Sequence, residues 1–298
     1  MELLQKFIEY LTLEKNYSTH TITAYQNDIH AFFCFVAREH EVSDPCLVPS
    51  VFVREWVLDL HDSGLSNRSV NRKITALKSF YNYLQKIEVV VESPLSNQKS
   101  LKRAQKVIIP FSEKEIDAVL TLEDERYTPF ENLRNKTMIH LFYATGIRQG
   151  ELMGLEVQDV DFESATIKVL GKRNKERLVP LYPEILTLLK TYMEQREGME
   201  VSIPNLFLTA RGGKLYNALV YRVINTYFSE VSTKEKRSPH VLRHSYATDM
   251  LSKGADLNSV KELLGHSSLA ATQVYTHNSL EKLKQVYNQA HPRSAKKK

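Results

Sequence analysis

Residues 238–277 read SPHVLRHSYATDMLSKGADLNSVKELLGHSSLAATQVYTH, and this stretch decides how the rest of the chain is interpreted. The proline at its second position is a helix-start signal, and Gly254 ends the predicted helix. His240 and Arg243 lie three residues apart on that helix, which places an imidazole and a guanidinium on one face, about one turn apart. Such a pair can bind one small anionic group.

The second half of this stretch contains another histidine and a tyrosine. A second predicted helix over residues 257–264 ends at Gly265, and His266 follows it directly in a short connection. Ser267 is the predicted N-cap of a third short helix, with Tyr275 near its end. Together the pieces predict a cationic pocket with a phenol beside it.

Two simpler interpretations stand beside this one. Tyr275 is one of 15 tyrosines in the chain, and a single tyrosine is usually a packing residue. His240 and His244, with His266 as third ligand, form a possible metal set. However, Arg243 would point a positive charge at that site, and no glutamate lies between the two helical histidines as a zinc-hydrolase motif requires. We therefore expect anion binding and no metal.

An upstream stretch, ATGIRQGEL at residues 144–152, contains a further arginine. Arg148 follows a glycine and opens a short predicted helix, where a lone arginine would usually be solvated. The joint pattern is more specific than its parts. This stretch, the His-x-x-Arg pair, the Leu-Gly-His-Ser sequence and the later tyrosine resemble the phage integrase family of tyrosine site-specific recombinases, and most closely its Xer branch.

The resemblance covers nearly the whole chain and implies a set of catalytic residues. The sequence LGKRNKER at residues 170–177 matches the β-hairpin turn that carries the family's lysine. Gln149, Gly150 and Arg173 stand where many relatives have other residues, which affects turn geometry and removes no catalytic group. The implied catalytic residues are Arg148, Lys172, His240, Arg243, His266 and Tyr275.

These side chains can exchange one phosphodiester for another. Tyr275 would attack the scissile phosphate while the two arginines hold its non-bridging oxygens. His240 would accept the phenol proton, and Lys172 would donate one to the departing 5′-oxygen. His266 would orient the phosphate. Attack leaves a 3′-phosphotyrosyl bond that a DNA hydroxyl can reverse without ATP, so we expect neither a metal nor another cofactor.

Composition is compatible with a two-domain intracellular protein. The 298 residues carry a formal charge of +5, which permits a nucleic-acid partner without requiring one. Cys34 and Cys46 are the only cysteines, and they have no metal-ligand spacing, which suits a reducing compartment. The sequence contains neither a signal-like N-terminus nor a stretch of membrane-spanning length. We therefore expect a cytoplasmic protein without a membrane partner.

Residues 1–97 are predicted to form a four-helix bundle. Apolar residues recur there at helical spacing, and Ser18 and Ser66 are predicted N-caps. The resemblance implies a SAM-like core-binding domain that grips the DNA face opposite the catalytic domain. Residues 98–110 form a basic linker, which suits a clamp around a duplex. The predicted DNA-contacting residues of these regions and of the hairpin turn are Arg68, Arg72, Lys73, Lys78, Lys102, Arg103 and Arg173.

Residues 111–298 are predicted to form a mostly helical catalytic domain with a small antiparallel β-sheet, the DNA breaking-rejoining fold of the family. FSEKEI at residues 111–116 is a capping box with a hydrophobic staple, and a helix over 132–144 follows. Strands are predicted at 166–170, 177–181 and 206–208. The resemblance implies that a terminal helix over 279–290 docks on a neighbouring protomer, although its amphipathic pattern alone favours its own domain.

Several functions are compatible with these residues. The leading hypothesis is a recombinase that resolves chromosome dimers at a Xer-type double-stranded DNA site. It would act as a homo- or heterotetramer, and the resemblance implies a paralogous recombinase and a cell-division DNA translocase as partners. An integrase of a mobile element would use the same chemistry, and a type IB topoisomerase would use closely similar residues on one duplex. A non-catalytic DNA-binding protein would not need Tyr275, Lys172 and Arg148 together.

Overall fold

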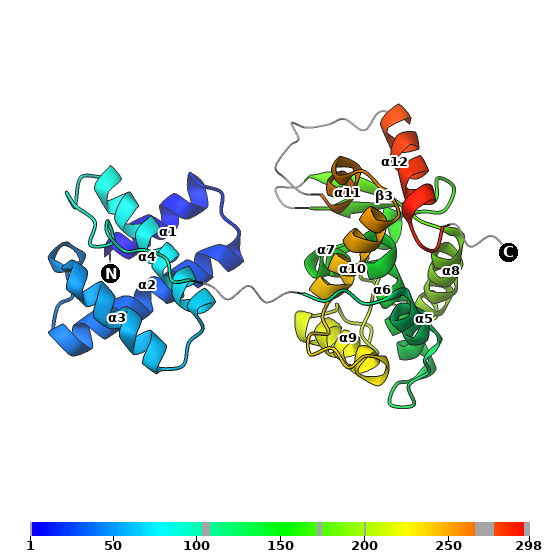
Figure 1. Ribbon diagram of the computed structural model, residues 1–298, viewed down its shortest axis with the longest axis horizontal. Coiled ribbons are helices and arrows are strands. Elements are labelled where there is room, and N and C mark those ends of the chain that lie inside the picture. Colours follow the sequence, from blue (N-terminus) through cyan, green and yellow to red (C-terminus); the bar gives the residue numbers. More distant parts are fainter. Residues whose placement is uncertain (1, 103–107, 172–174, 200, 266–276, 295–298) are drawn as a thin grey trace. The chain divides into compact units, whose positions relative to one another are not determined.

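The computed structural model describes residues 2–102, 108–171, 175–199, 201–265 and 277–294. The chain divides into two compact units, Met1–Lys106 and Val107–Lys298, each built around its own hydrophobic core (Figure 1). None of the described helices has the length and apolar character needed to span a membrane.

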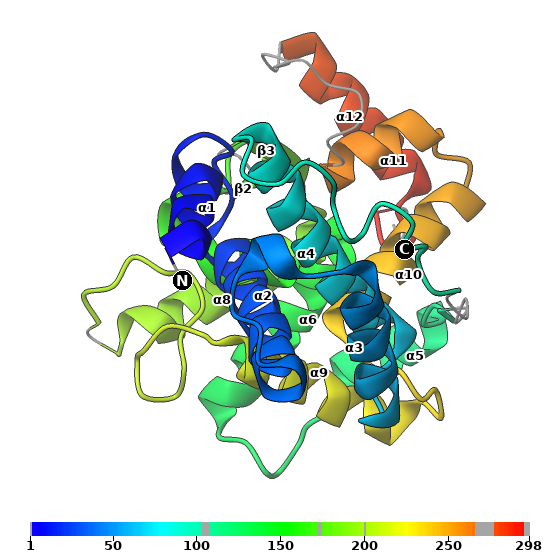
Figure 2. The same ribbon diagram turned by 90° about the vertical axis from the view of Figure 1, so that its left-hand side faces the viewer.

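The N-terminal unit is the predicted bundle of four helices, which Figure 2 shows from another side. Its helices are α1 (Glu2–Leu13), α2 (Thr19–His40), α3 (Ser50–Asp62) and α4 (Asn67–Lys86). Ser18 and Ser66 are N-caps as predicted, because each side chain accepts a hydrogen bond from the backbone three residues on. Apolar faces at helical spacing meet in a core that contains Phe7, Phe32 and Trp56.

The second unit, Val107–Lys298, is called the catalytic unit after its predicted role, and it is mainly helical. Its helices are α5 (Glu113–Thr121), α6 (Pro129–Thr145), α7 (Gln149–Gly154), α8 (Pro183–Glu197), α9 (Asn217–Val231), α10 (Pro239–Ser252), α11 (Leu257–Leu264) and α12 (His277–Ala290). Helix α6 is buried over most of its length and packs against α8 and α10, so it forms the centre of the unit. The predicted capping box at the start of α5 is present between Ser112 and Glu115.

This unit also contains a three-stranded antiparallel sheet. Strands β1 (Val160–Asp161), β2 (Thr166–Leu170) and β3 (Glu176–Pro180) lie in that order. The prediction of a third strand at 206–208 was wrong, since this region forms only isolated bridges. Leu206, Phe207 and Leu208 are all buried without alternation, because they cover the core as a connecting segment, and two-residue β1 is too short for a periodic signal.

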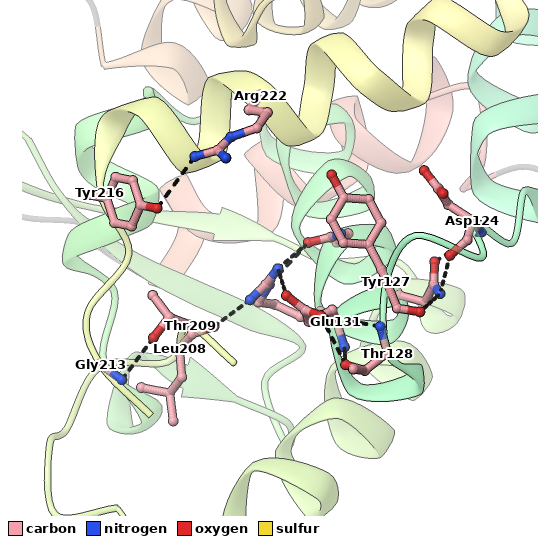
Figure 3. A network of polar contacts seen from close by, with 12 residues as sticks. Asp124, Tyr127, Thr128, Glu131, Leu208, Thr209, Gly213, Tyr216 and Arg222 are labelled. Carbon is pink, nitrogen blue, oxygen red and sulfur yellow. Dashed lines mark hydrogen bonds and ion pairs between the residues drawn. The ribbon is translucent and has the colours of Figure 1, made fainter. Parts of the chain in front are cut away.

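A network of polar contacts fixes the start of α6 (Figure 3). The helix begins at Pro129, earlier than predicted, because Thr128 and Glu131 form a capping box. The Asn132 side chain donates to the carbonyl oxygens of Asp124 and Tyr127 at 2.9 and 3.1 Å. These contacts secure one end of the central helix, and the other end leads to the candidate site.

Helix α12 packs on its own catalytic unit. Leu283, Tyr287 and Ala290 are buried, and the Tyr287 hydroxyl donates to the carbonyl oxygen of Ala144 at 3.0 Å. The helix begins two residues before Ser279, which therefore is not its N-cap. This is the packing that the amphipathic pattern alone favours. Docking of the segment on a neighbouring protomer stays a prediction.

Candidate active site

The turn between α6 and α7 positions Arg148. Gly146 ends α6 with a φ of 59°, in the left-handed region. A Cβ at this position would lie 2.5 Å from Cδ1 of Tyr246 and 2.6 Å from Cδ2 of Leu264, so a larger residue would also clash. Buried Ile147 follows, and Arg148 is the N-cap residue of α7. The glycine therefore determines where this arginine enters the site.

Glu151 holds two arginines that are far apart in the sequence. Arg148 Nη1 lies 2.7 Å from Glu151 Oε1, and the Arg148 backbone N–H donates to Oε2 at 2.8 Å. Arg177 on β3 donates through Nη1 and Nη2 to the two carboxylate oxygens at 3.1 and 2.8 Å. Burial disfavours the charged carboxylate, but the bonds from Arg177 and Arg148 outweigh it and lower the pKa of Glu151 to about 2.

Arg243 on α10 completes the group from a third segment. Its Nη1 donates to the carbonyl oxygen of Gly146 at 2.5 Å, and its Nη2 donates to that of Leu264 at 2.7 Å. Burial and the nearby positive charge of Arg148 lower the pKa of Arg243 to about 10, so it remains protonated at neutral pH. Two guanidiniums that repel each other in a partly buried place favour an anion between them.

The C-terminus of α11 is the point where the three arginines meet. Arg177 Nε donates to the Leu263 carbonyl at 2.9 Å, Arg243 Nη2 to that of Leu264, and Arg148 Nη2 to that of Gly265 at 3.3 Å. The last carbonyls of a helix have no partner within it and carry a partial negative charge. Three consecutive carbonyls therefore align three guanidiniums directly before His266.

His240 lies on the first turn of α10, on the same helix as Arg243. Its side chain is exposed, and so is that of His244. Among the described residues, no group of three histidine, cysteine or acidic side chains could hold a metal ion. His266, the third member of the alternative metal set, lies outside the described residues. His240 is thus accessible to solvent, whereas Arg148 and Arg243 are held by the contacts given above.

Comparison with known proteins identifies the family of the chain. The phage integrase family matches residues 110–282, and the N-terminal SAM-like domain of phage integrases matches residues 4–87. The tyrosine recombinase XerC of Anoxybacillus flavithermus is 38% identical over 98% of either chain. That of Chlorobaculum parvum is 36% identical over 97% of this chain and 94% of its own. The chain belongs to the phage integrase family. It is a site-specific tyrosine recombinase of the Xer type, an enzyme that breaks and rejoins DNA.

Solved structures share the fold of this recombinase. The XerH site-specific recombinase bound to a palindromic difH substrate matches with a TM-score of 0.70 and 24% identity, over 96% of this chain and 84% of that one. The Tn1549 transposon integrase in complex with circular intermediate DNA matches with a TM-score of 0.72 and 20% identity, over 94% and 98%. The predicted fold class, a helical bundle plus a mostly helical catalytic domain with a small sheet, is confirmed.

Several predicted site residues of the recombinase lie outside the described residues. They are Arg103, Lys172, Arg173, His266 and Tyr275. The structure does describe the residues next to them in the sequence. The Gly171 N–H donates to the Lys175 carbonyl at 2.8 Å, which closes the hairpin on either side of residues 172–174. Gly265, the residue before His266, accepts the bond from Arg148 described above.

The predicted DNA contacts on α4 differ in their surroundings. Arg68 is exposed, whereas Lys73 has a side chain that is 15% exposed and lies 3.0 Å from the buried carboxylate of Asp28. Arg72 also contacts Asp28, at 2.5 Å, and remains half exposed. Lys78 donates to the Gln98 carbonyl at 2.6 Å. Lys102 of the linker is exposed.

Glu151 and Arg177 were not predicted as site residues, although each lies inside a motif that contains a predicted site residue. Neither spacing nor composition indicates that a helix-start glutamate and a strand arginine 26 residues later meet in space. The available signal was the alternation of β3, in which Arg177 takes the inward register beside buried Val179. A charged residue at an inward strand position requires a partner.

Proposed function

We propose that Tyr275 of this recombinase attacks a DNA phosphodiester that Arg148 and Arg243 hold, and forms a 3′-phosphotyrosyl bond. The observation that supports this proposal most is the meeting of the guanidiniums on the last carbonyls of α11, one residue before His266. Planar guanidiniums can bind both non-bridging oxygens and stabilise the charge that gathers there in the transition state.

The remaining roles follow from ordinary proton chemistry. A tyrosine hydroxyl has a pKa of about 10, so it needs a positive pocket and a proton acceptor to attack at neutral pH. His240 is the proposed acceptor, and its exposure leaves it accessible to an incoming phenol. Lys172 donates a proton to the departing 5′-oxygen, and His266 orients the phosphate. The arginines stabilise charge that a metal stabilises in other nucleases, so the reaction proceeds without one.

The test is a suicide substrate, a duplex nicked beside the cleavage position so that the covalent product accumulates. We expect Tyr275→Phe to bind the site with nearly unchanged affinity and to form no covalent product, because only the nucleophilic oxygen is lost. Wild-type protein in EDTA is the second arm, and we expect full attachment there. Covalent product from the phenylalanine variant would refute the nucleophile, and activity restored only by zinc or magnesium would support the histidine metal set.

We also propose the biological setting. Identity of 36–38% to proteins named tyrosine recombinase XerC, over nearly the whole chain, supports resolution of chromosome dimers in the cytoplasm. The recombinase would exchange strands between two DNA sites in a tetramer, with a paralogous recombinase and a DNA translocase as partners. Sequencing the DNA trapped on Tyr275 in cells tests this. A single chromosomal site supports the proposal, whereas the ends of a mobile element would show an integrase.

A further inference from the structure

Arg177 is a buried arginine that joins three segments of the catalytic unit. Its side chain is 5% exposed, and it comes from β3 directly after the hairpin turn. It binds both oxygens of Glu151 on α7 and the Leu263 carbonyl on α11. A Cβ at Gly265 would lie 3.1–3.3 Å from its guanidinium end, so the glycine also allows this close approach.

The contacts of Arg177 control how Glu151 binds Arg148. A carboxylate and an arginine prefer a bidentate pair, in which two N–H groups meet two oxygens. Here Arg177 takes that geometry, and the Arg148 side chain reaches the same carboxylate through Nη1 alone, while the Arg148 backbone N–H donates to Oε2. The Nη2 group of Arg148 donates instead to the Gly265 carbonyl. Without Arg177, the carboxylate would be free to bind Arg148 bidentately and neutralise it.

The same side chain also connects the hairpin with the end of α11. Arg177 stands opposite Val169 in the β2 and β3 register, so its backbone belongs to the strand pair that carries residues 172–174. Its Nε bond to Leu263 fixes this strand against the last turn of α11, which precedes His266. One buried residue therefore contacts the elements that lead to two further catalytic positions.

We propose that Arg177 is a positioning residue of the recombinase: by occupying Glu151 bidentately and binding the Leu263 carbonyl, it keeps Arg148 available for the scissile phosphate. The inference rests on the proposed role of Arg148. It assigns Arg177 no contact with DNA. Its contribution is to the rate of cleavage and not to the affinity for the site.

The test compares Arg177→Met with wild type in single-turnover covalent attachment at saturating DNA. We expect the rate to fall about 100-fold, as for a misplaced catalytic group, while the dissociation constant for the DNA site stays within about twofold. Adding Glu151→Gln to Arg177→Met removes the carboxylate that would capture Arg148, so we expect the double variant to react faster than the single one. A double variant as slow as Arg177→Met, or slower, would overturn the proposal.

A neutral substrate separates this role from general loss of structure. Replacing one non-bridging oxygen of the scissile phosphate by a methyl group removes the charge that the arginines stabilise. If Arg177 acts through Arg148, we expect the difference between wild type and Arg177→Met to become small on at least one of the two methylphosphonate isomers, and we expect the same of Arg148→Ala. An equal deficit on the charged substrate and on both neutral ones would show that Arg177 only supports the fold.

Arg196 provides a matched control. It is also a buried arginine of the catalytic unit, and it donates to the carbonyl oxygens of Asn205 and Ile203 at 3.0 and 2.6 Å. Arg196→Met should lower stability without the selective loss of cleavage rate. Hydrogen exchange of the Gly265 amide in the absence of DNA should accelerate in Arg177→Met and not in Arg196→Met. Hydrogen exchange of the Gly265 amide can be compared even if the wild-type protein forms no covalent product. Absence of covalent product would refute the proposed function but not the positioning role of Arg177.

Discussion

At the scale of single residues, the site depends on a carboxylate between two guanidiniums. The folded-state pKa of Glu151 is about 2, below its ordinary value of 4.5. Between these values the folded protein binds fewer protons at this group than the unfolded chain does. The stabilisation from Glu151 is therefore complete above pH 4.5 and is lost as the pH falls toward 2.

The lowered pKa of Glu151 leads to a measurable pH dependence of stability. We expect Glu151→Gln to be less stable than wild type at pH 6, because a neutral amide replaces the partner of Arg148 and Arg177. The difference should become smaller as the pH falls below 4.5, since the wild-type carboxylate gains a proton. Urea unfolding midpoints at pH 6 and pH 3 measure it, with exposed Glu163→Gln as the control. A stability difference between Glu151→Gln and wild type that does not change with pH would contradict the lowered pKa of Glu151.

Some residues of the candidate site could be predicted from the sequence, and others could not, for a physical reason. His240 and Arg243 were predictable because helical spacing places them on one face, and α10 has the expected bounds within one residue. Glu151 and Arg177 were not, because their contact is made by tertiary packing between α7 and β3. Local patterns report which face of an element is buried, and they do not report which buried charges meet.

At the scale of elements, α12 is connected to the arginines through the end of α6. The Tyr287 hydroxyl satisfies the carbonyl of Ala144, and the His291 ring lies 3.3 Å from that of Tyr143. These carbonyls belong to the last turn of α6, two and three residues before Gly146, whose own carbonyl holds Arg243. A change in the packing of α12 therefore reaches the arginine through a single turn of helix.

We expect Tyr287→Phe to slow covalent attachment several-fold at saturating DNA, because the turn that presents the Gly146 carbonyl loses a hydrogen bond. Stability should fall by about 1 kcal/mol, the usual net value of one such bond. Tyr192→Phe is the control, since the Tyr192 hydroxyl also lies in the interior, where it donates to the Leu206 carbonyl at 3.2 Å and accepts from the Leu208 N–H at 3.1 Å. Equal cleavage rates of the two variants would show that α12 does not influence the arginine.

At the scale of the whole molecule, two units joined by a basic segment are expected to bind one duplex together. Affinity for DNA then depends on how many phosphates the whole chain neutralises, and each one adds about one unit to the salt dependence. The formal charge of +5 does not show which lysines and arginines contribute. The surroundings of each lysine or arginine decide whether it can contact a DNA phosphate, and α4 contains two contrasting cases. Arg68 is exposed, while Lys73 is mostly buried against Asp28.

We therefore expect Arg68→Ala to weaken binding to all DNA sequences and to lower the slope of log affinity against log salt by about one unit. Lys73→Met should leave that slope unchanged and should lower the thermal stability of the N-terminal unit, because the buried carboxylate of Asp28 loses a partner. Binding titrations between about 50 and 200 mM salt, together with thermal melts, distinguish the two. If Lys73→Met lowers the slope as Arg68→Ala does, the Lys73 ammonium of the wild type leaves Asp28 and binds a phosphate when DNA binds. If Arg68→Ala changes sequence preference at constant slope, Arg68 contacts base edges.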